Sequence, residues 1–113
     1  MSLDEYFSTG PAHERPVFDA VMAHLDSLGP VHVEPVSVGI FLKQPRKFAE
    51  LRPMQKWVAL SFSLSHHVEH PLMTRKPIPH GGRWHHVLNV RSPDEIDDDV
   101  RGWLTEAYFD APR

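Results

Sequence analysis

Apolar residues near the start of the chain recur with the period of a helix. Between Pro16 and Leu28 they occupy one stripe of a 3.6-residue repeat, namely Val17, Phe18, Val21, Met22, Leu25 and Leu28. Pro16 suits the first turn, where its missing N–H has no helical partner to lose. Gly29-Pro30 favours a stop, because glycine accepts the left-handed C-terminal conformation and proline cannot continue the helix. The pattern predicts an amphipathic helix over 16–28.

From Val31 onward the period of the apolar residues changes to two, which is typical of strands with one buried face. The alternation predicts strands at 36–42, 56–64 and 83–90, and a weaker strand at 47–51. In the clearest of them Val58, Leu60, Phe62 and Leu64 point one way, and Trp57, Ala59, Ser61 and Ser63 point the other.

Two segments lack such a period. Residues 1–10 are expected to form a flexible N-terminal segment. Residues 65–82 are polar and contain Pro71, Pro77, Pro79 and Gly81-Gly82, so we expect a long loop. Connections of this length tend to be functional or mobile.

The end of the chain begins with a helix-start pattern. Ser92-Pro93-Asp94-Glu95 predicts a capping box with Ser92 as the N-cap, and replacing Ser92 by alanine is expected to cost about 1 kcal/mol. The apolar stripe that follows contains Ile96, Val100, Trp103, Leu104, Ala107 and Tyr108.

The order of these segments predicts the fold class. Short connections between consecutive strands favour antiparallel pairing. We therefore expect one α+β domain over 1–113, with a sheet of three to five antiparallel strands in one layer. The N-terminal and C-terminal helices would pack on the same face of that sheet in a second layer.

In this fold the other face of the sheet has no helix to cover it. Its predicted residues are small and polar with two aromatics among them: Ser37, Gly39, Phe41, Lys43, Trp57, Ala59, Ser61, Ser63, His85, Val87, Asn89 and Arg91. One interpretation is a ligand or partner surface, including a homodimer interface. The simpler one is a solvated sheet face with cross-strand aromatic packing.

Composition changes this picture mainly through charge. The chain has 113 residues, a net charge of −3 and no cysteine, which excludes disulfides and cysteine-ligated metal sites. The charges divide by segment. Residues 43–91 hold nine basic and two acidic side chains (+7), whereas 1–42 and 92–113 are each −5. The predicted helices are therefore acidic, and the sheet and its loop are basic.

A basic sheet face suggests binding of phosphate groups, carried by a small ligand or by nucleic acid. The candidate ligand- or partner-binding residues are Phe41, Lys43, Arg46, Trp57, Arg75, Lys76, His85 and Arg91. Trp57 beside Lys43, Arg46 and Lys56 would suit base stacking. The overall pI of about 6.3 and the lack of known nucleic-acid-binding motifs weigh against a dedicated nucleic-acid binder. The alternative interpretation is a solvated surface with salt bridges.

Histidines suggest a second class of function. Six of the nine lie at 66–86, so a metal-dependent site or a small enzyme built on this region is the alternative hypothesis. The spacing disfavours it, because the adjacent His85 and His86 point to opposite faces of a strand. No catalytic motif occurs, and we predict no catalytic residue, metal ligand or cofactor.

The N-terminus shows neither a basic region nor an apolar core of a signal peptide, and no stretch approaches 20 apolar residues. The expectation is a cytoplasmic protein with no membrane partner.

Three stretches together resemble a known family. They are Val38-Gly39-Ile40-Phe41-Leu42-Lys43 with its continuation to Pro53, Trp84-His85-His86-Val87, and Arg91 to Asp98 followed by Trp103-Leu104 and Ala107-Tyr108. They resemble the bacterial domain-of-unknown-function family DUF5655. The resemblance implies a compact α+β domain that occurs alone or at the end of longer chains, some with nuclease-like neighbours. It transfers no catalytic residue, and His66, His67, His70 and His80 match the family pattern least well.

Overall fold

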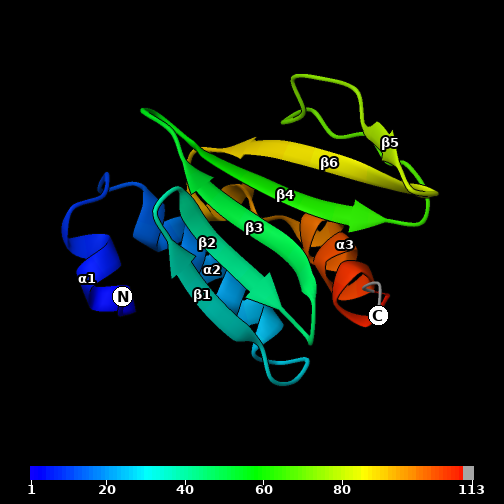
Figure 1. Ribbon diagram of the computed structural model, residues 1–113. Helices are drawn as coiled ribbons and strands as arrows, with labels where there is room; N and C mark the ends of the chain where they lie inside the picture. Colours follow the sequence, from blue (N-terminus) through cyan, green and yellow to red (C-terminus); the bar gives the residue numbers. More distant parts are fainter. Residues whose placement is uncertain (111–113) are drawn as a thin grey trace.

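The computed structural model describes residues 1–110 as an α+β fold with one antiparallel sheet. The helices are α1 (Leu3–Ser8), α2 (Glu14–Leu25), the 3-10 turn η1 (Pro93–Glu95) and α3 (Asp98–Phe109). The strands are β1 (His32–Val36), β2 (Gly39–Lys43), β3 (Lys47–Pro53), β4 (Val58–Leu64), β5 (Ile78–His80) and β6 (Arg83–Val90). Their order across the sheet is β1-β2-β3-β4-β6-β5, and α2 and α3 lie on the same side of it (Figure 1).

The prediction of three to five strands is wrong, because the sheet has six. The segment 36–42 reads as one strand because its alternation is unbroken, yet it contains a tight turn at Ser37-Val38, across which Val36 pairs with Gly39. β5 lies within the predicted loop 65–82. It pairs with β6 and is connected to it by Gly81 and Gly82. The positive φ values of these glycines, 58° and 78°, suit a two-residue hairpin turn.

The alternation that predicts β4 and β6 is confirmed by burial. Val58, Leu60, Phe62 and Leu64 are buried, and they pair across the sheet with alternate residues of β6. The helices supply the other side of the core through fully buried residues, Val17, Val21 and Leu25 from α2 and Val100 and Leu104 from α3. Pro16 lies in the first turn of α2, as predicted.

The cap of the last helix differs from the prediction. Ser92 makes no capping hydrogen bond, and α3 begins after Asp97, whose Oδ1 accepts from the Val100 N–H at 2.9 Å. Glu95 instead accepts from the Arg91 N–H at 2.6 Å and closes the short turn η1. The capping pattern at 92–95 therefore belongs to a separate 3-10 turn.

Asp97 also fastens the long loop to α3. Its Oδ2 lies 2.9 Å from His70 Nε2, and His70 Nδ1 accepts from the Leu72 N–H, so a neutral ring with its proton on Nε2 satisfies both contacts. Partial burial alone would raise the pKa of Asp97. The hydrogen bonds from His70 and Val100, with the nearby Arg101, outweigh it and lower that pKa.

We expect Asp97→Ala to lower the free energy of unfolding by about 1–2 kcal/mol, because it removes the cap of α3. Ser92→Ala should change it by less than about 0.5 kcal/mol, as at an ordinary surface position. Since the folded pKa of Asp97 is lowered, its contribution is complete above the unfolded value of about 3.9 and is lost as the pH falls through the folded value. Urea denaturation at pH 7 measures both variants. A larger loss for Ser92→Ala than for Asp97→Ala would contradict this assignment of the cap.

The loop between β4 and β5 is attached along β6. The Val68 N–H donates to His86 Nε2 at 3.0 Å, and the Asn89 N–H donates to the Leu72 carbonyl at 3.0 Å. β5 pairs with the first half of β6, and the loop covers the edge of its second half.

Within residues 1–110, no helix has the length and apolar character required to cross a bilayer.

Candidate ligand-binding face

We call the side of the sheet opposite α2 and α3 the open face. Its centre is formed by cross-strand pairs of small or polar residues, with Glu50 opposite Ser61 and Ser63 opposite His85. Small side chains here follow from the strand period, because Ala59, Ser61 and Ser63 alternate with the core residues of β4. A larger ligand can therefore approach the backbone of the sheet.

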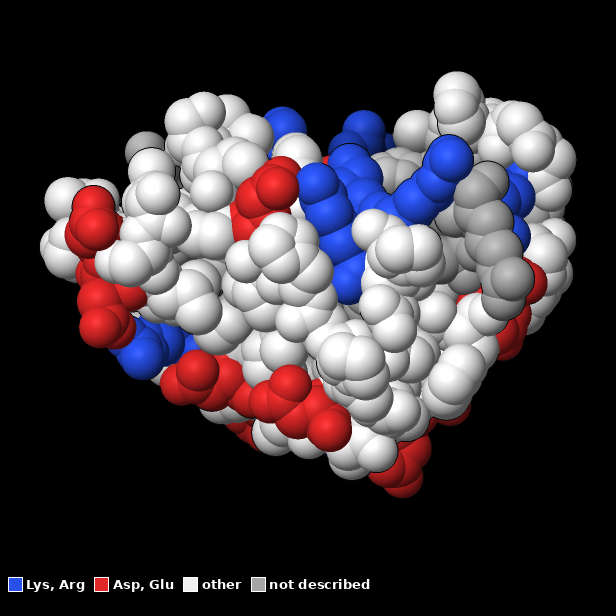
Figure 2. All heavy atoms as spheres, turned by 60° about the horizontal axis from the view of Figure 1, so that its bottom comes forward, with Lys and Arg blue, Asp and Glu red and all other residues white. Residues whose placement is uncertain are grey.

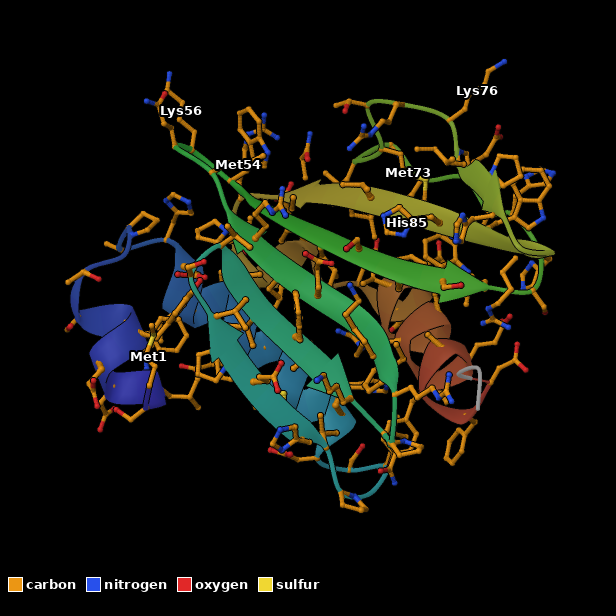
Figure 3. The ribbon with its side chains drawn as sticks, viewed as in Figure 1. Met1, Met54, Lys56, Met73, Lys76 and His85 are labelled. Carbon is orange, nitrogen blue, oxygen red and sulfur yellow. The ribbon has the colours of Figure 1, made fainter. Side chains whose placement is uncertain are left out.

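Three hollows on the open face share His85 as a wall residue. The first, of about 50 Å³, also contacts Lys47, Glu50, Ser61 and Ser63. The second, of about 190 Å³, lies among Glu50, Arg52, Ala59, Ser61 and Arg75, and the third, of about 420 Å³, among Ser63, Ile78, His80 and Arg83. We name these together the sheet-face hollow. In Figure 3, which looks onto the open face, His85 lies near the loop that carries Met73 and Lys76.

Positive side chains dominate the rim of the sheet-face hollow. Lys47, Arg52, Arg75 and Arg83 line it, against the single carboxylate of Glu50. Acidic residues are concentrated in the helical segments instead, and in Figure 2 most of the visible Lys and Arg lie in the upper part of the view, with a band of Asp and Glu below them. The uneven charge of the sequence is therefore also a spatial separation on the folded surface.

Three of the four cations have partners within the protein. Lys47 Nζ lies 3.0 Å from Glu50 Oε1, and Arg52 lies 4.0 Å from the other oxygen of that carboxylate. Arg83 donates to the Ser63 hydroxyl and carbonyl and lies 3.3 Å from Asp110. Arg75 is exposed and has no hydrogen-bond or ion-pair partner among residues 1–110, so its five donors are available to a ligand.

The imidazole of His85 lies at the centre of this charge pattern. Partial burial on the sheet lowers its pKa, Glu50 opposes that shift, and Lys47, Arg75 and His80 add to it. His85 is still exposed as a residue, so a ligand can reach its ring. A lowered pKa favours the uncharged ring, which can donate one hydrogen bond and accept another.

The structure brings together only some of the residues proposed from the sequence. His85 and Arg75 line the same hollow. Phe41 lies on the same face, with Lys47 Nζ 4.5 Å above its ring. Lys43 is on that face too, but it pairs with Glu34 at 3.1 Å.

Trp57 and Arg91 form a separate pair. The Arg91 guanidinium lies 5.4 Å from the centre of the Trp57 ring, and neither residue lines the sheet-face hollow. The Trp57 indole is partly buried, and its Nε1 has no partner among the described residues. A base stacked on the ring face that Arg91 covers would have to displace Arg91.

The two remaining candidates lie in connections. Arg46 is exposed in the turn between β2 and β3. Lys76 lines a different hollow of about 530 Å³, formed by the long loop itself around His70 and Met73. Arg75, its neighbour, contacts both hollows.

His80 and His85 line one hollow, but three other histidines of the cluster make separate contacts. His66 pairs with Glu106 at 2.5 Å, His70 pairs with Asp97, and His86 is fully buried against Phe62. In the part of the chain that the structure describes, no three His, Asp or Glu side chains converge in a group that could hold a metal ion.

Sequence reasoning missed several residues that line the sheet-face hollow, among them Lys47, Glu50, Arg52, Ile78, His80 and Arg83. Glu50 and Arg52 alternate on β3, so the strand period places them on the open face once that strand is extended to Pro53. Ile78 and His80 belong to β5, which is too short to show a period. Their hairpin turn at Gly81-Gly82 is the one local signal that could have identified them.

One family model matches nearly the whole chain. Residues 3–111 match the model described as "Domain of unknown function (DUF5655)". The chain belongs to the DUF5655 family. This confirms the resemblance carried by the segments around Val38–Pro53, Trp84–Val87 and Arg91–Asp98. No curated protein and no solved structure matches this DUF5655 domain.

Proposed function

We propose that this domain is a binding module that holds a phosphate-bearing ligand in the sheet-face hollow. The observation that carries the proposal is the convergence of three hollows on His85, inside a rim of four cations and one carboxylate. A ligand with negative charge would gain from that rim, and the small residues of β4 leave room for it over the sheet.

Arg75 is the principal anchor in this proposal. A guanidinium without a partner can grip two oxygens of one phosphate without first breaking an internal ion pair. Arg83 is already oriented by Ser63, and His85 can add a hydrogen bond from the floor of the hollow. Glu50 would disfavour dianionic groups close to β3, so the phosphate should lie toward Arg75 and β6.

The size of the hollow favours a small phosphorylated ligand over a nucleic-acid strand. Its largest part measures about 420 Å³, within the range of small-molecule sites. The aromatic ring predicted to stack on a base, Trp57, lies outside the hollow and beneath Arg91. A mononucleotide and a single strand share the phosphate chemistry, so direct comparison of the two separates them.

We expect Arg75→Ala to weaken binding of adenosine monophosphate about tenfold or more, because a charge-assisted hydrogen bond is worth about 1.5–3 kcal/mol. Isothermal titration calorimetry at pH 7 and low salt measures this. The matched control is Lys76→Ala, which removes one positive charge from the next residue but not from the hollow. It should change the affinity less than about twofold, as expected for a screened surface charge.

The same titration with inorganic phosphate and with a single-stranded oligonucleotide of about ten nucleotides identifies the source of the phosphate. Binding of the oligonucleotide alone, with a steep salt dependence, would favour the nucleic-acid version. Equal losses for Arg75→Ala and Lys76→Ala would indicate only diffuse attraction, and no binding of any of the three probes would contradict the proposal.

A further inference from the structure

Another cavity lies near the N-terminus, between α1, the start of α2 and the β1–β2 turn. It measures about 350 Å³. Its walls include two carboxylates, Glu5 and Glu14, together with Tyr6 and Gly10 and the apolar side chains of Val36 and Pro53. Met1 lines the cavity as well, and none of the lining residues is a lysine or an arginine. The cavity is separate from the sheet-face hollow and shares no residue with it.

Glu14 is the unusual group in this cavity. It is fully buried, although a carboxylate is among the side chains least often found inside a protein without a partner. Its Oε2 accepts a hydrogen bond from the Tyr6 hydroxyl at 2.5 Å. Its Oε1 has no partner within residues 1–110. Buried polar atoms are almost always hydrogen-bonded, so an unpaired carboxylate oxygen at a cavity wall points to a missing donor.

Gly10 lies directly beside Oε1. A Cβ atom at Gly10 would lie 3.1 Å from Oε1, closer than an ordinary van der Waals contact, so a side chain at this position would press on that oxygen. Burial raises the pKa of Glu14, while the Tyr6 hydroxyl and His13 oppose the shift. The position of Glu14 in the first turn of α2 also favours the ionised form. A positive donor against Oε1 would complete the set of contacts.

We propose that this cavity binds an aliphatic primary amine, whose ammonium group donates to Glu14 Oε1. An ammonium fits better than a guanidinium, because Oε2 is already occupied by Tyr6 and two-point pairing with a planar fork is blocked. Val36 and Pro53 offer apolar surface for the alkyl chain. Glu5 supplies a second carboxylate on the same wall, so a diamine should bind more tightly than a monoamine.

The test uses NMR titration of the whole chain with butylammonium, 1,4-diaminobutane, butylguanidinium and the neutral butanol. We expect the two amines to shift the signals of Glu14, Tyr6 and Gly10, with the diamine the tighter ligand. Glu14→Gln keeps the shape of the side chain and removes its charge, and it should weaken the amines about tenfold or more. Asp19→Asn, the same charge change at an exposed position of α2, should leave their affinity unchanged.

A second variant keeps the proposal testable if Glu14→Gln is poorly folded. Gly10→Ala retains both carboxylates and places a methyl group against Oε1, so it should also abolish the shifts at Glu14. The proposal is overturned if the amines cause no shifts, if butanol binds as tightly as butylammonium, or if Glu14→Gln and Gly10→Ala bind the amines like the wild type. Tighter binding of butylguanidinium than of butylammonium would overturn the assignment of the ligand class.

Discussion

Gly39→Ala is expected to destabilise the fold by about 3 kcal/mol or more, because the added methyl group would clash with the backbone of β3. Gly39 opens β2, where a Cβ atom would lie 2.3 Å from the Leu51 carbonyl oxygen and 3.2 Å from the Arg52 Cα. Neither contact can be relieved by moving a flexible side chain. The alanine would therefore force β2 and β3 apart beside two fully buried residues, Ile40 and Leu51.

Urea denaturation of the variant measures this loss, and Gly102→Ala is the matched control. Gly102 is exposed in the middle of α3, and a Cβ there meets nothing within 4 Å. That substitution should stabilise the protein by about 0.5–1 kcal/mol, because alanine is the better helix former. If both glycine variants were equally stable, the close approach of β2 to β3 would be wrong.

Replacing His86 should have the second large effect, since this ring joins the sheet core to the long loop. His86 is fully buried, stacks on Phe62 with ring centres 5.2 Å apart, and accepts the Val68 N–H through Nε2. His86→Ala would leave a cavity and an unpaired backbone donor, and we expect a loss of about 2–4 kcal/mol.

The same residue should make stability depend on pH. Burial lowers the pKa of His86, the backbone of Phe62 opposes that shift, and the neighbouring His85, His66 and His67 add to it. The unfolded chain therefore binds a proton more readily, so this contribution is complete above the unfolded value of about 6.5 and is lost as the pH falls toward the folded value. Protonated Nε2 also cannot accept from Val68.

Thermal unfolding between pH 7.5 and 5 measures this dependence. The melting temperature of the wild type should fall with pH, and His86→Gln, which keeps an acceptor but does not titrate, should flatten the slope. His85→Gln should flatten it less, because His85 is exposed although its pKa is shifted in the same direction. An unchanged slope in His86→Gln would show that His86 is not the titrating group.

The strands with strict alternation could be predicted from the sequence, and the physical reason is their burial on one face. β4 and β6 alternate because Leu60 and Leu88 face the helices while Ser61 and Val87 face outward. The turn between β1 and β2 could not be predicted, because Val36 and Val38 continue the apolar alternation through it. Its determinant, the closeness of Gly39 to β3, is a tertiary contact.

The candidate sites also combine features that the sequence predicts with features that depend on tertiary contacts. The open face and its basic character follow from strand period and segment charge, whereas the free guanidinium of Arg75 depends on how the loop folds along β6. Glu14 carries a signal that could have been recognised. It lies three residues before Val17 and four before Phe18, so it continues the apolar stripe of α2 onto its first residue. A carboxylate on the buried stripe of a helix indicates a buried polar site rather than ordinary apolar packing.

The most direct test of the account is an NMR titration of the labelled protein with adenosine monophosphate at pH 7. We expect the amide signals of Ser61, Ser63, Arg75 and His85 to shift together along one binding curve, and Arg75→Ala to move that curve to about tenfold higher ligand concentration. The signals of Glu14 and of the buried faces of α2 and α3 should stay in place. Shifts confined to the helices, or no shifts on the open face, would contradict the assignment of the sheet-face hollow as the ligand site.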